Sequence, residues 1–180
     1  MAWTSPLTAV ANTAMTAAQW NTFLRDNLNA QGPTSATAGG QLLVTTGFGS
    51  LTMRTPGVTF VSLSATTASP SYVDVDPSGA EVTVTTGNKA MVTIGSGISN
   101  STAGCGGRAS VDLAGDTERV ADELNVVAGD SGNASDFFKL TWTTIYSPLN
   151  PGVQIFGMRY RAAGGGTASF NDRLMMVVPF

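Results

Sequence analysis

The sequence predicts a mainly β protein: an antiparallel, jelly-roll-like β-sandwich preceded by an N-terminal arm with one short α-helix. Residues 16–28 carry apolar side chains at helical spacing, and short runs beyond Gly32 alternate apolar and polar side chains between Gly- and Pro-containing turns. We therefore expect three parts. An anchoring arm and helix would span residues 1–31, a Gly/Thr/Pro linker or hairpin residues 32–57, and the β-sandwich residues 58–180.

The helix of the arm has a start signal and an apolar face. Thr16, followed three positions later by Gln19, fits a capping box, in which each side chain accepts a hydrogen bond from the other residue's backbone amide. Four bulky residues then fall on one face: Trp20, Phe23, Leu24 and Leu28. A helix of about 13 residues is only marginally stable in water, so this face needs a cover. Either the chain's own β domain covers it, or these four residues and Trp3 anchor the arm to another chain or to further copies.

The remainder of the chain reads as turns and strands. The linker contains at most a short hairpin around residues 42–44 and Leu51. Eight runs beyond it have strand patterns: residues 58–63, 72–75, 81–85, 90–94, 108–113, 137–146, 154–160 and 173–178. Residues 117–127 suit either a helical turn or a strand with a bulge.

The aromatic residues near the end of the chain have two interpretations. Trp142, Tyr146 and Tyr160 could together form a platform for a sugar ring. Trp142, however, lies on one side of the long run over residues 137–146 together with Phe138 and Leu140. This alternation favours a place in the core for Trp142.

Composition excludes several classes of function. The chain is 42% apolar and only 12% charged, with a net charge of −3. Disordered proteins combine high net charge with low hydrophobicity, and nucleic-acid binding needs clustered Lys and Arg. Basic residues are scattered here, apart from Arg159 and Arg161. A surface with so little charge favours a protein partly covered by neighbouring subunits, although a monomer with a neutral surface is the alternative.

The sequence gives little support for catalysis or for metal binding. It has no histidine, so Ser-His-Asp and Cys-His sites are excluded, and Cys105 is the single cysteine. Seven acidic residues could supply a carboxylate pair for glycoside hydrolysis, but no spacing selects two of them, and a solvated rim of loops is the alternative. They are Asp112, Asp116, Glu118, Asp122, Glu123, Asp130 and Asp136. The run from Asp74 imitates a calcium loop until its twelfth position, which is Thr85. We expect no catalytic residue, no metal and no cofactor.

Two segments resemble a known family. The N-terminal residues Trp3, Thr16, Trp20, Asn21, Arg25, Asp26, Asn27 and Leu28 resemble the tail-like N-terminus of small virion proteins of tailed bacteriophages. The segment from Tyr160 through Gly164-Gly165-Gly166-Thr167 to Phe180 is similar to the last hairpin of those proteins. It is also similar to C1q- and TNF-like trimeric jelly rolls, whose final strand runs through the trimer core. The resemblance covers only the two ends of the chain.

This resemblance implies a non-enzymatic bacteriophage structural protein, a trimeric β module attached to the particle surface by its arm as a capsid decoration or head fibre. The alternative is a minor tail or tail-fibre protein that binds a glycan or receptor. The expected partners are two further copies and the major capsid protein or tail proteins, with no nucleic acid and no membrane. Assembly would take place in the bacterial cytoplasm. The trimer interface would involve the apolar C-terminal run, at Met175, Val177 and Phe180.

Overall fold

A computed structural model describes residues 14–22, 36–47 and 50–180. The chain forms two compact units, Met1–Met53 and Arg54–Phe180, and each is described by itself. Among the described residues, no helix combines the length and the apolar character that a membrane crossing requires.

The described residues of the N-terminal unit form one short helix and a two-stranded sheet. The helix is α1 (Ala17–Trp20), and the sheet pairs β1 (Leu42–Gly47) with β2 (Ser50–Arg54). The capping box at the start of α1 is confirmed. Thr16 Oγ1 accepts a hydrogen bond from the backbone amide of Gln19 at 3.2 Å, and Gln19 Oε1 accepts one from the amide of Thr16 at 2.9 Å.

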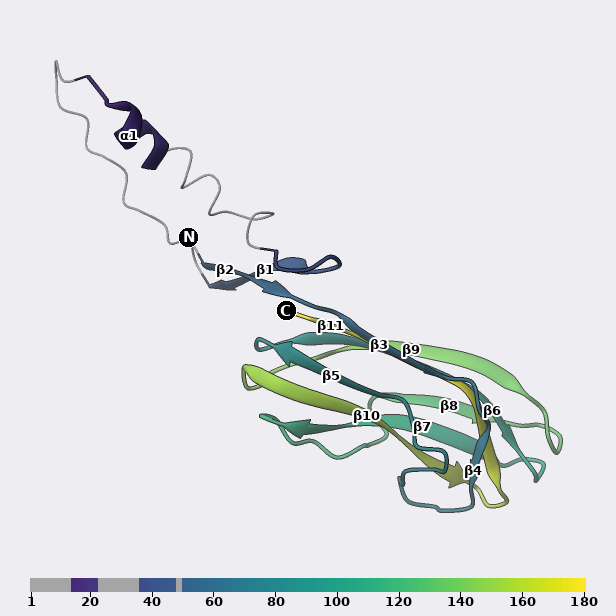
Figure 1. The fold of residues 1–180 in the computed structure, drawn as a ribbon. Coiled ribbons are helices and arrows are strands. Elements are labelled where there is room, and N and C mark those ends of the chain that lie inside the picture. The colour runs from purple at the N-terminus through teal and green to yellow at the C-terminus, as the bar shows by residue number, and fades with distance from the viewer. Residues whose placement is uncertain (1–13, 23–35, 48–49) are drawn as a thin grey trace. The chain divides into compact units, whose positions relative to one another are not determined.

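The second unit is a sandwich of two antiparallel sheets, visible as two layers in Figure 1. One sheet has four strands in the order β5-β10-β7-β8; the other has the order β3-β11-β6-β9, with β4 also paired to β11. The strands are β3 (Gly57–Val61), β4 (Ala65–Thr67), β5 (Glu81–Thr86), β6 (Ala90–Asn100), β7 (Gly106–Gly115), β8 (Val126–Asp130), β9 (Phe138–Tyr146), β10 (Gly152–Ala163) and β11 (Ala168–Pro179). This is the strand arrangement of a jelly roll, so the predicted fold class is confirmed.

Alternating side chains from the two sheets meet in one core. In β5, Val82 and Val84 are buried while the residues between them are exposed, which is the pattern of a strand with one wet face. From β10, Phe156, Met158 and Tyr160 are fully buried at alternate positions. The ring of Phe156 meets Tyr146 of β9 edge to face, with centroids 5.9 Å apart, a favourable geometry for two aromatic rings.

The expected strand over residues 72–75 is reduced to a single bridge between Val73 and Tyr160. The cause is local. Asp74 Oδ1 accepts hydrogen bonds from the backbone amides of the next residue, at 2.9 Å, and of Gly79, at 3.0 Å. Such side-chain bonds to the backbone compete with a strand ladder and favour a turn. The carboxylate that suggested a calcium loop therefore stabilises this turn.

The ambiguous segment over residues 117–127 is mostly irregular. Arg119 bridges back to Leu113, and only at Val126 does the chain enter β8, which pairs with β7. The segment thus forms a loop held against β7 and contains no helix.

The glycine turn near the C-terminus does not join two paired strands. Gly164, Gly165 and Gly166 all have positive φ, a conformation that glycine adopts without steric cost. They connect β10 in one sheet with β11 in the other. The segment expected to be a hairpin therefore crosses between the sheets and closes the sandwich.

A bulge in β11 decides which of its side chains face the core. The register of β11 against β6 shifts between Asn171 and Leu174, and Asp172 lies inside the bulge with φ +47°. An extra residue at a bulge reverses the alternation of side chains beyond it. Phe170 faces inward before the bulge, and Arg173 is the next side chain buried in the core.

Arg173 is the largest fully buried side chain of the second unit. Its guanidinium donates hydrogen bonds to three backbone carbonyls, those of Leu63 at 3.1 Å, Pro77 at 2.9 Å and Ser78 at 3.4 Å. Its Cζ atom lies 5.6 Å from the centroid of the Tyr160 ring. A buried charge is tolerated only where hydrogen bonds replace its hydration. The carbonyls supply such bonds to Nη1 and Nη2 without a carboxylate, whereas Nε has no hydrogen-bond partner among the described residues.

We predict that Arg173→Ala lowers the free energy of unfolding by about 3 kcal/mol or more, because it leaves a cavity and removes three charge-assisted hydrogen bonds. Urea denaturation of the full chain measures this loss. The control is Lys139→Ala, which removes an exposed ion pair with Asp172 at 2.8 Å and should cost no more than about 1 kcal/mol. Equal losses in the two variants would contradict the structural role of Arg173.

Candidate functional site

The predicted anchoring residues are only partly described. Trp20 ends α1 and is 55% exposed, and no residue of that helix is buried. Trp3, Phe23, Leu24 and Leu28 lie outside the described residues. The anchoring role therefore stays a prediction, with an exposed indole as the described part of the surface.

Two of the three residues expected at a trimer interface are inside the sandwich. Met175 and Val177 have no exposed surface, whereas Phe180 is 38% exposed. A side chain without exposed surface cannot contact a second copy, so these two positions require correction. The side chains of β11 that point away from the core are Leu174, Met176 and Val178.

These three side chains belong to a larger apolar surface, the outer face of the five-stranded sheet. Val58 and Phe60 of β3, at 69% and 59% exposure, lie opposite Met176 and Leu174. On the other side of β11, Val178 lies opposite Met91, which in turn lies opposite Ile145 of β9, at 62% exposure. We define the outer face by seven residues: Val58, Phe60, Met91, Ile145, Leu174, Met176 and Val178.

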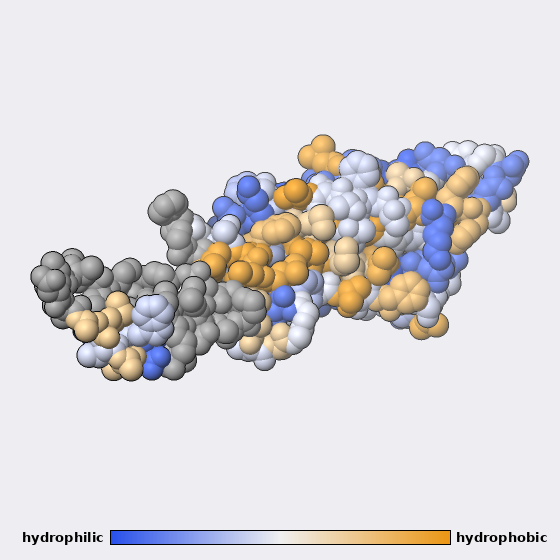
Figure 2. All heavy atoms as spheres, turned by 90° about the horizontal axis from the view of Figure 1, so that it is seen from above, coloured by the Kyte–Doolittle hydropathy of each residue, from blue (hydrophilic) through white to orange (hydrophobic). Residues whose placement is uncertain are grey.

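The residues between these apolar side chains carry no charge. Thr93 and Thr143 lie opposite each other across β6 and β9, with their hydroxyl oxygens 2.9 Å apart. Gly95 lies between Leu174 and Thr141. Figure 2 shows apolar residues, in orange, interspersed with polar residues on the side of the molecule seen from above. The outer face is thus uncharged over these rows of cross-strand neighbours.

The expectation that Trp142 lies in the core is wrong, because its side chain is 46% exposed. Trp142 lies opposite the buried Ile94 and shares its side of the sheet, so the expected alternation holds. However, β9 is an edge strand, and the strand at the corresponding edge of the other sheet, β8, has only five residues against nine in β9. The shorter strand cannot cover the whole inner side of β9, so Trp142 remains exposed. The sugar platform is not formed either, since Tyr146 and Tyr160 are buried.

A polar pocket of about 480 Å³ lies on the outward side of the four-stranded sheet. We call it the Tyr72 pocket. Strands β7 and β10 contribute Asp112, Arg159 and Arg161, whose neighbours along each strand are buried, so these three side chains point outward. Two loops complete the wall, with residues 70–72 on one side and residues 120–123 on the other; their lining residues are Pro70, Ser71, Tyr72, Val120, Ala121 and Glu123.

The first loop is fixed to β10 by backbone hydrogen bonds. Val73 donates to the carbonyl of Tyr160 at 2.9 Å and accepts from the amide of Tyr160 at 2.8 Å. The amide of Ala162 donates to the carbonyl of Ser69 at 2.8 Å. The side chain of Tyr72 is therefore carried by a segment held on both sides.

The second loop is fixed to β7. The amide of Leu113 donates to the carbonyl of Arg119 at 2.8 Å. The buried hydroxyl of Ser110 donates to the carbonyl of Asn125 at 3.2 Å and accepts from the amide of Asp122 at 3.3 Å. These bonds on either side of Glu123 place its carboxylate over the sheet.

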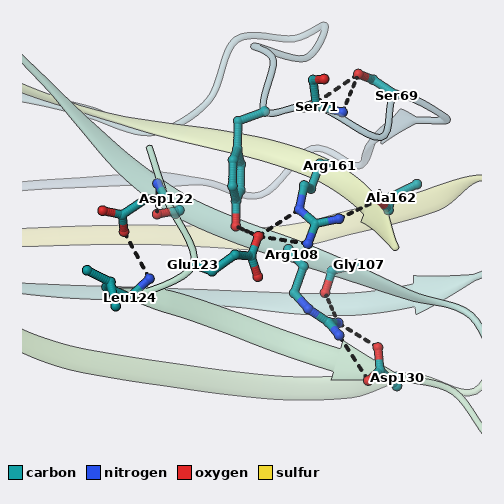
Figure 3. A network of polar contacts seen from close by, with 12 residues as sticks. Ser69, Ser71, Gly107, Arg108, Asp122, Glu123, Leu124, Asp130, Arg161 and Ala162 are labelled. Carbon is teal, nitrogen blue, oxygen red and sulfur yellow. Dashed lines mark hydrogen bonds and ion pairs between the residues drawn. The ribbon is translucent and has the colours of Figure 1, made fainter. Parts of the chain in front are cut away.

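Three groups converge on one oxygen of Glu123. The hydroxyl of Tyr72 donates to Oε1 at 2.7 Å, and Nε and Nη2 of Arg161 lie 2.8 Å and 2.7 Å from the same oxygen. The guanidinium also lies over the Tyr72 ring, 5.5 Å from its centroid. Figure 3 shows this network beside the pair of Arg108 and Asp130. Both charge pairs extend from the same sheet face.

The second charge pair of the pocket joins Arg159 and Asp112. Arg159 Nε lies 3.0 Å from Asp112 Oδ2, and both side chains are less than a third exposed. Burial raises the pKa of the Asp112 carboxyl, and Arg159 opposes this effect only in part. For Glu123, burial also acts to raise the pKa, but hydrogen bonds from Tyr72 and Arg161 outweigh it and hold the pKa below its usual value.

Burial also raises the pKa of Tyr72, and its hydrogen bond to Glu123 adds to this effect. The phenol is therefore protonated at neutral pH and available as a hydrogen-bond donor to the carboxylate. Two cations and two carboxylates line the pocket, so its formal charge balances. Its arrangement suits a polar ligand.

Of the seven candidate acids, the structure brings two together at the pocket. Asp112 and Glu123 line the pocket, whereas Asp122 Oδ1 accepts a hydrogen bond from the amide of Leu124 at 2.9 Å. Asp116 is an exposed loop residue after β7. The described part of the chain holds no group of three or more acidic or Cys side chains suited to a metal ion.

Tyr72, Arg159 and Arg161 were not predicted as site residues. One signal existed for the two arginines. Their i, i+2 spacing within a strand places both side chains on one face of a sheet. No comparable signal identifies Tyr72, because its contact with Glu123 spans 51 positions of sequence.

The pKa shifts predict opposite effects of pH in two variants. Because the folded-state pKa of Asp112 is raised, its contribution to stability is present in acid and lost as the pH rises through that pKa. The lowered pKa of Glu123 gives a contribution that is present above its unfolded-state pKa and lost as the pH falls through the folded-state pKa.

Unfolding by urea between about pH 3 and pH 7 tests both signs. The stability of the wild type relative to Asp112→Asn should fall as the pH rises, and its stability relative to Glu123→Gln should increase. Parallel pH curves for the two variants would contradict these environments.

Comparison with solved structures shows a structural likeness to a viral chain. No protein-family model matches the chain, and no curated protein matches it. Among solved structures, the chain is similar to a chain in the structure of infectious bursal disease virus Gx strain, with 14% sequence identity and a TM-score of 0.44. The likeness covers 72% of this chain and 34% of the viral chain. The chain thus corresponds to about a third of that chain's length.

Proposed function

We propose that this protein is a non-enzymatic structural protein of a bacteriophage virion. In this proposal, the sandwich associates with two further copies through the outer face of the five-stranded sheet. The N-terminal arm attaches the trimer to the particle surface as a capsid decoration or head fibre. The observation that carries the proposal is that outer face, which exposes apolar side chains on β3 and β9 without any charge between them.

An apolar face of this kind supports self-association. Contiguous exposed apolar surface is uncommon in monomeric proteins and is typical of interaction surfaces, whose centres are depleted of charge. The outward side chains Arg108, Asp112, Arg159 and Arg161 of the four-stranded sheet are charged, whereas the exposed ion pair of Lys139 with Asp172 on the five-stranded sheet lies beyond the apolar rows. Burial of side chains such as Phe60 and Ile145 against another copy stabilises an assembly by roughly 2 kcal/mol each.

The arm supports attachment to a particle. The capping box fixes the start of α1, and the helix ends on a Trp20 side chain that is more than half exposed. The resemblance of this segment to the arms of phage virion proteins gives the class of partner, a capsid or tail protein. Jelly rolls occur in capsid proteins and in lectins among others, so the fold by itself does not assign the function.

The absence of catalysis is part of the proposal. The carboxylates of the Tyr72 pocket are paired with guanidinium groups, and the sequence offers no histidine as a general base. The alternative function, a minor tail or tail-fibre protein that binds a glycan or receptor, is favoured by the pocket itself, which a purely architectural role does not require.

Self-association is tested with a double variant, Phe60→Lys with Ile145→Lys, analysed by light scattering. We expect a trimer for the wild type and a folded monomer for the variant, because two added charges on one face repel and cannot be desolvated. The control is Val153→Lys, which changes a half-exposed apolar residue of β10 in the other sheet and should remain a trimer. A monomeric wild type, or a trimeric double variant, would refute the interface.

Attachment is tested with Trp20→Ala in purified particles, whose protein content is compared by gel densitometry. Loss of the indole should reduce incorporation at least about tenfold, as expected from roughly 2 kcal/mol of lost apolar burial. Met15→Ala, which removes another half-exposed apolar side chain ahead of the helix, serves as the control. Normal incorporation of Trp20→Ala would rule out the indole as an anchor. In wild-type particles, the same measurement gives the number of copies per particle, which separates a head location from a tail location.

A further inference from the structure

We propose that the Tyr72 pocket binds an uncharged saccharide. The pocket lies on the four-stranded sheet, and its use does not depend on association through the outer face of the other sheet. The inference rests on four features of the pocket: its balanced charge, its apolar margin, its fixed side chains and its position away from a free strand edge.

The balance of charge selects a neutral ligand. Arg159 is paired with Asp112, and Arg161 is paired with Glu123, so neither guanidinium is left to compensate an anion. A phosphate, sulfate or carboxylate ligand would have to displace one of these carboxylates, and an ammonium ligand would have to displace a guanidinium. A hydroxyl group donates and accepts at once, so it can bond to a carboxylate and a guanidinium that are already paired.

The margin of the pocket provides apolar contacts beside these polar groups. Val120 is 82% exposed at the rim, and Pro70 and Ala121 complete the apolar lining. A sugar ring presents C–H groups on its faces and hydroxyl groups around its edge, so it matches this combination. The volume of about 480 Å³ falls within the usual range for small-molecule sites, roughly 300 to 1,000 Å³.

The polar side chains are held in place before a ligand arrives. Tyr72 and Arg161 both bond to Oε1 of Glu123 and contact each other through the ring. The loops that carry Tyr72 and Glu123 are each fixed by backbone hydrogen bonds to β10 or β7. Side chains that are already ordered lose less conformational entropy on binding, and this favours recognition of a small ligand.

The surroundings make a peptide a poorer occupant than a saccharide. Extended peptides commonly bind by adding a strand to a free sheet edge. The two strands that line the pocket, β7 and β10, are paired with each other and lie inside the four-stranded sheet, with β8 and β5 outside them. A ligand at the pocket is therefore recognised by side chains and not by backbone pairing, and this favours a saccharide over an extended peptide.

The experiment uses the full-length protein and saturation-transfer-difference NMR with a panel of neutral oligosaccharides. Sialylated and uronic-acid-containing oligosaccharides of equal length, together with a mixture of short peptides, are the comparison probes. We expect signals from at least one neutral oligosaccharide and none from the comparison probes. Absence of binding to every neutral probe, or preferential binding of a charged probe or a peptide, would overturn the proposal.

Three variants locate the binding. Glu123→Gln and Tyr72→Phe should each weaken the binding of the neutral oligosaccharide by about tenfold, because each disrupts the bonds that order the pocket. Trp142→Ala removes a half-exposed aromatic ring that does not line the pocket, and it should bind as the wild type does. Near-ultraviolet circular dichroism verifies that each variant is folded. Binding that survives in folded Glu123→Gln but is lost in Trp142→Ala would place the site elsewhere.

The same NMR spectra test the saccharide site and the absence of catalysis separately. Hydrolysis of the bound oligosaccharide would produce new anomeric signals over time. Such signals, abolished in Glu123→Gln, would refute the absence of catalysis and support the location of the saccharide site.

Discussion

The buried guanidinium of Arg173 is the constraint on which much of the sandwich depends. It bonds to the carbonyls of Leu63 and of Pro77 and Ser78, which lie at the two ends of the long connection between β3 and β5. That connection carries Tyr72. A cation inside an apolar core is costly unless hydrogen bonds replace its hydration, and the carbonyls of this connection supply those bonds, so the core and the connection must take up one arrangement together. The position of the pocket wall is therefore coupled to the packing of the core.

The two sheets present outward surfaces of different chemistry. The five-stranded sheet exposes Val58, Phe60 and Ile145 with threonine and glycine between them. The four-stranded sheet carries the ion pairs of Arg159 and Arg161 and is partly covered by two loops. Such a division allows one face to be buried in an assembly while the other remains open to a ligand. A structural module and a binding module are compatible in one sandwich for this reason.

The two carboxyls of the pocket are each paired with a guanidinium, but their pKa values are shifted in opposite directions. Burial acts to raise the pKa of both carboxyls, yet the outcome differs. Glu123 receives hydrogen bonds from Tyr72 and from Arg161, whereas Asp112 has a single guanidinium partner. Carboxyls with pKa values displaced in opposite directions also occur in glycosidases. Here both carboxyls are paired with guanidinium groups.

The sequence by itself determined what local patterns encode: the capping box at Thr16, the alternating strand β5 and the class of the fold. Tertiary structure alone decided which side of β11 is buried, because Leu174 to Val178 is apolar on both faces and the bulge at Asp172 sets the alternation. It also decided the exposure of Trp142 and the meeting of segments that form the pocket. Local periodicity places side chains on a face, but only the packing of distant strands determines what that face contacts.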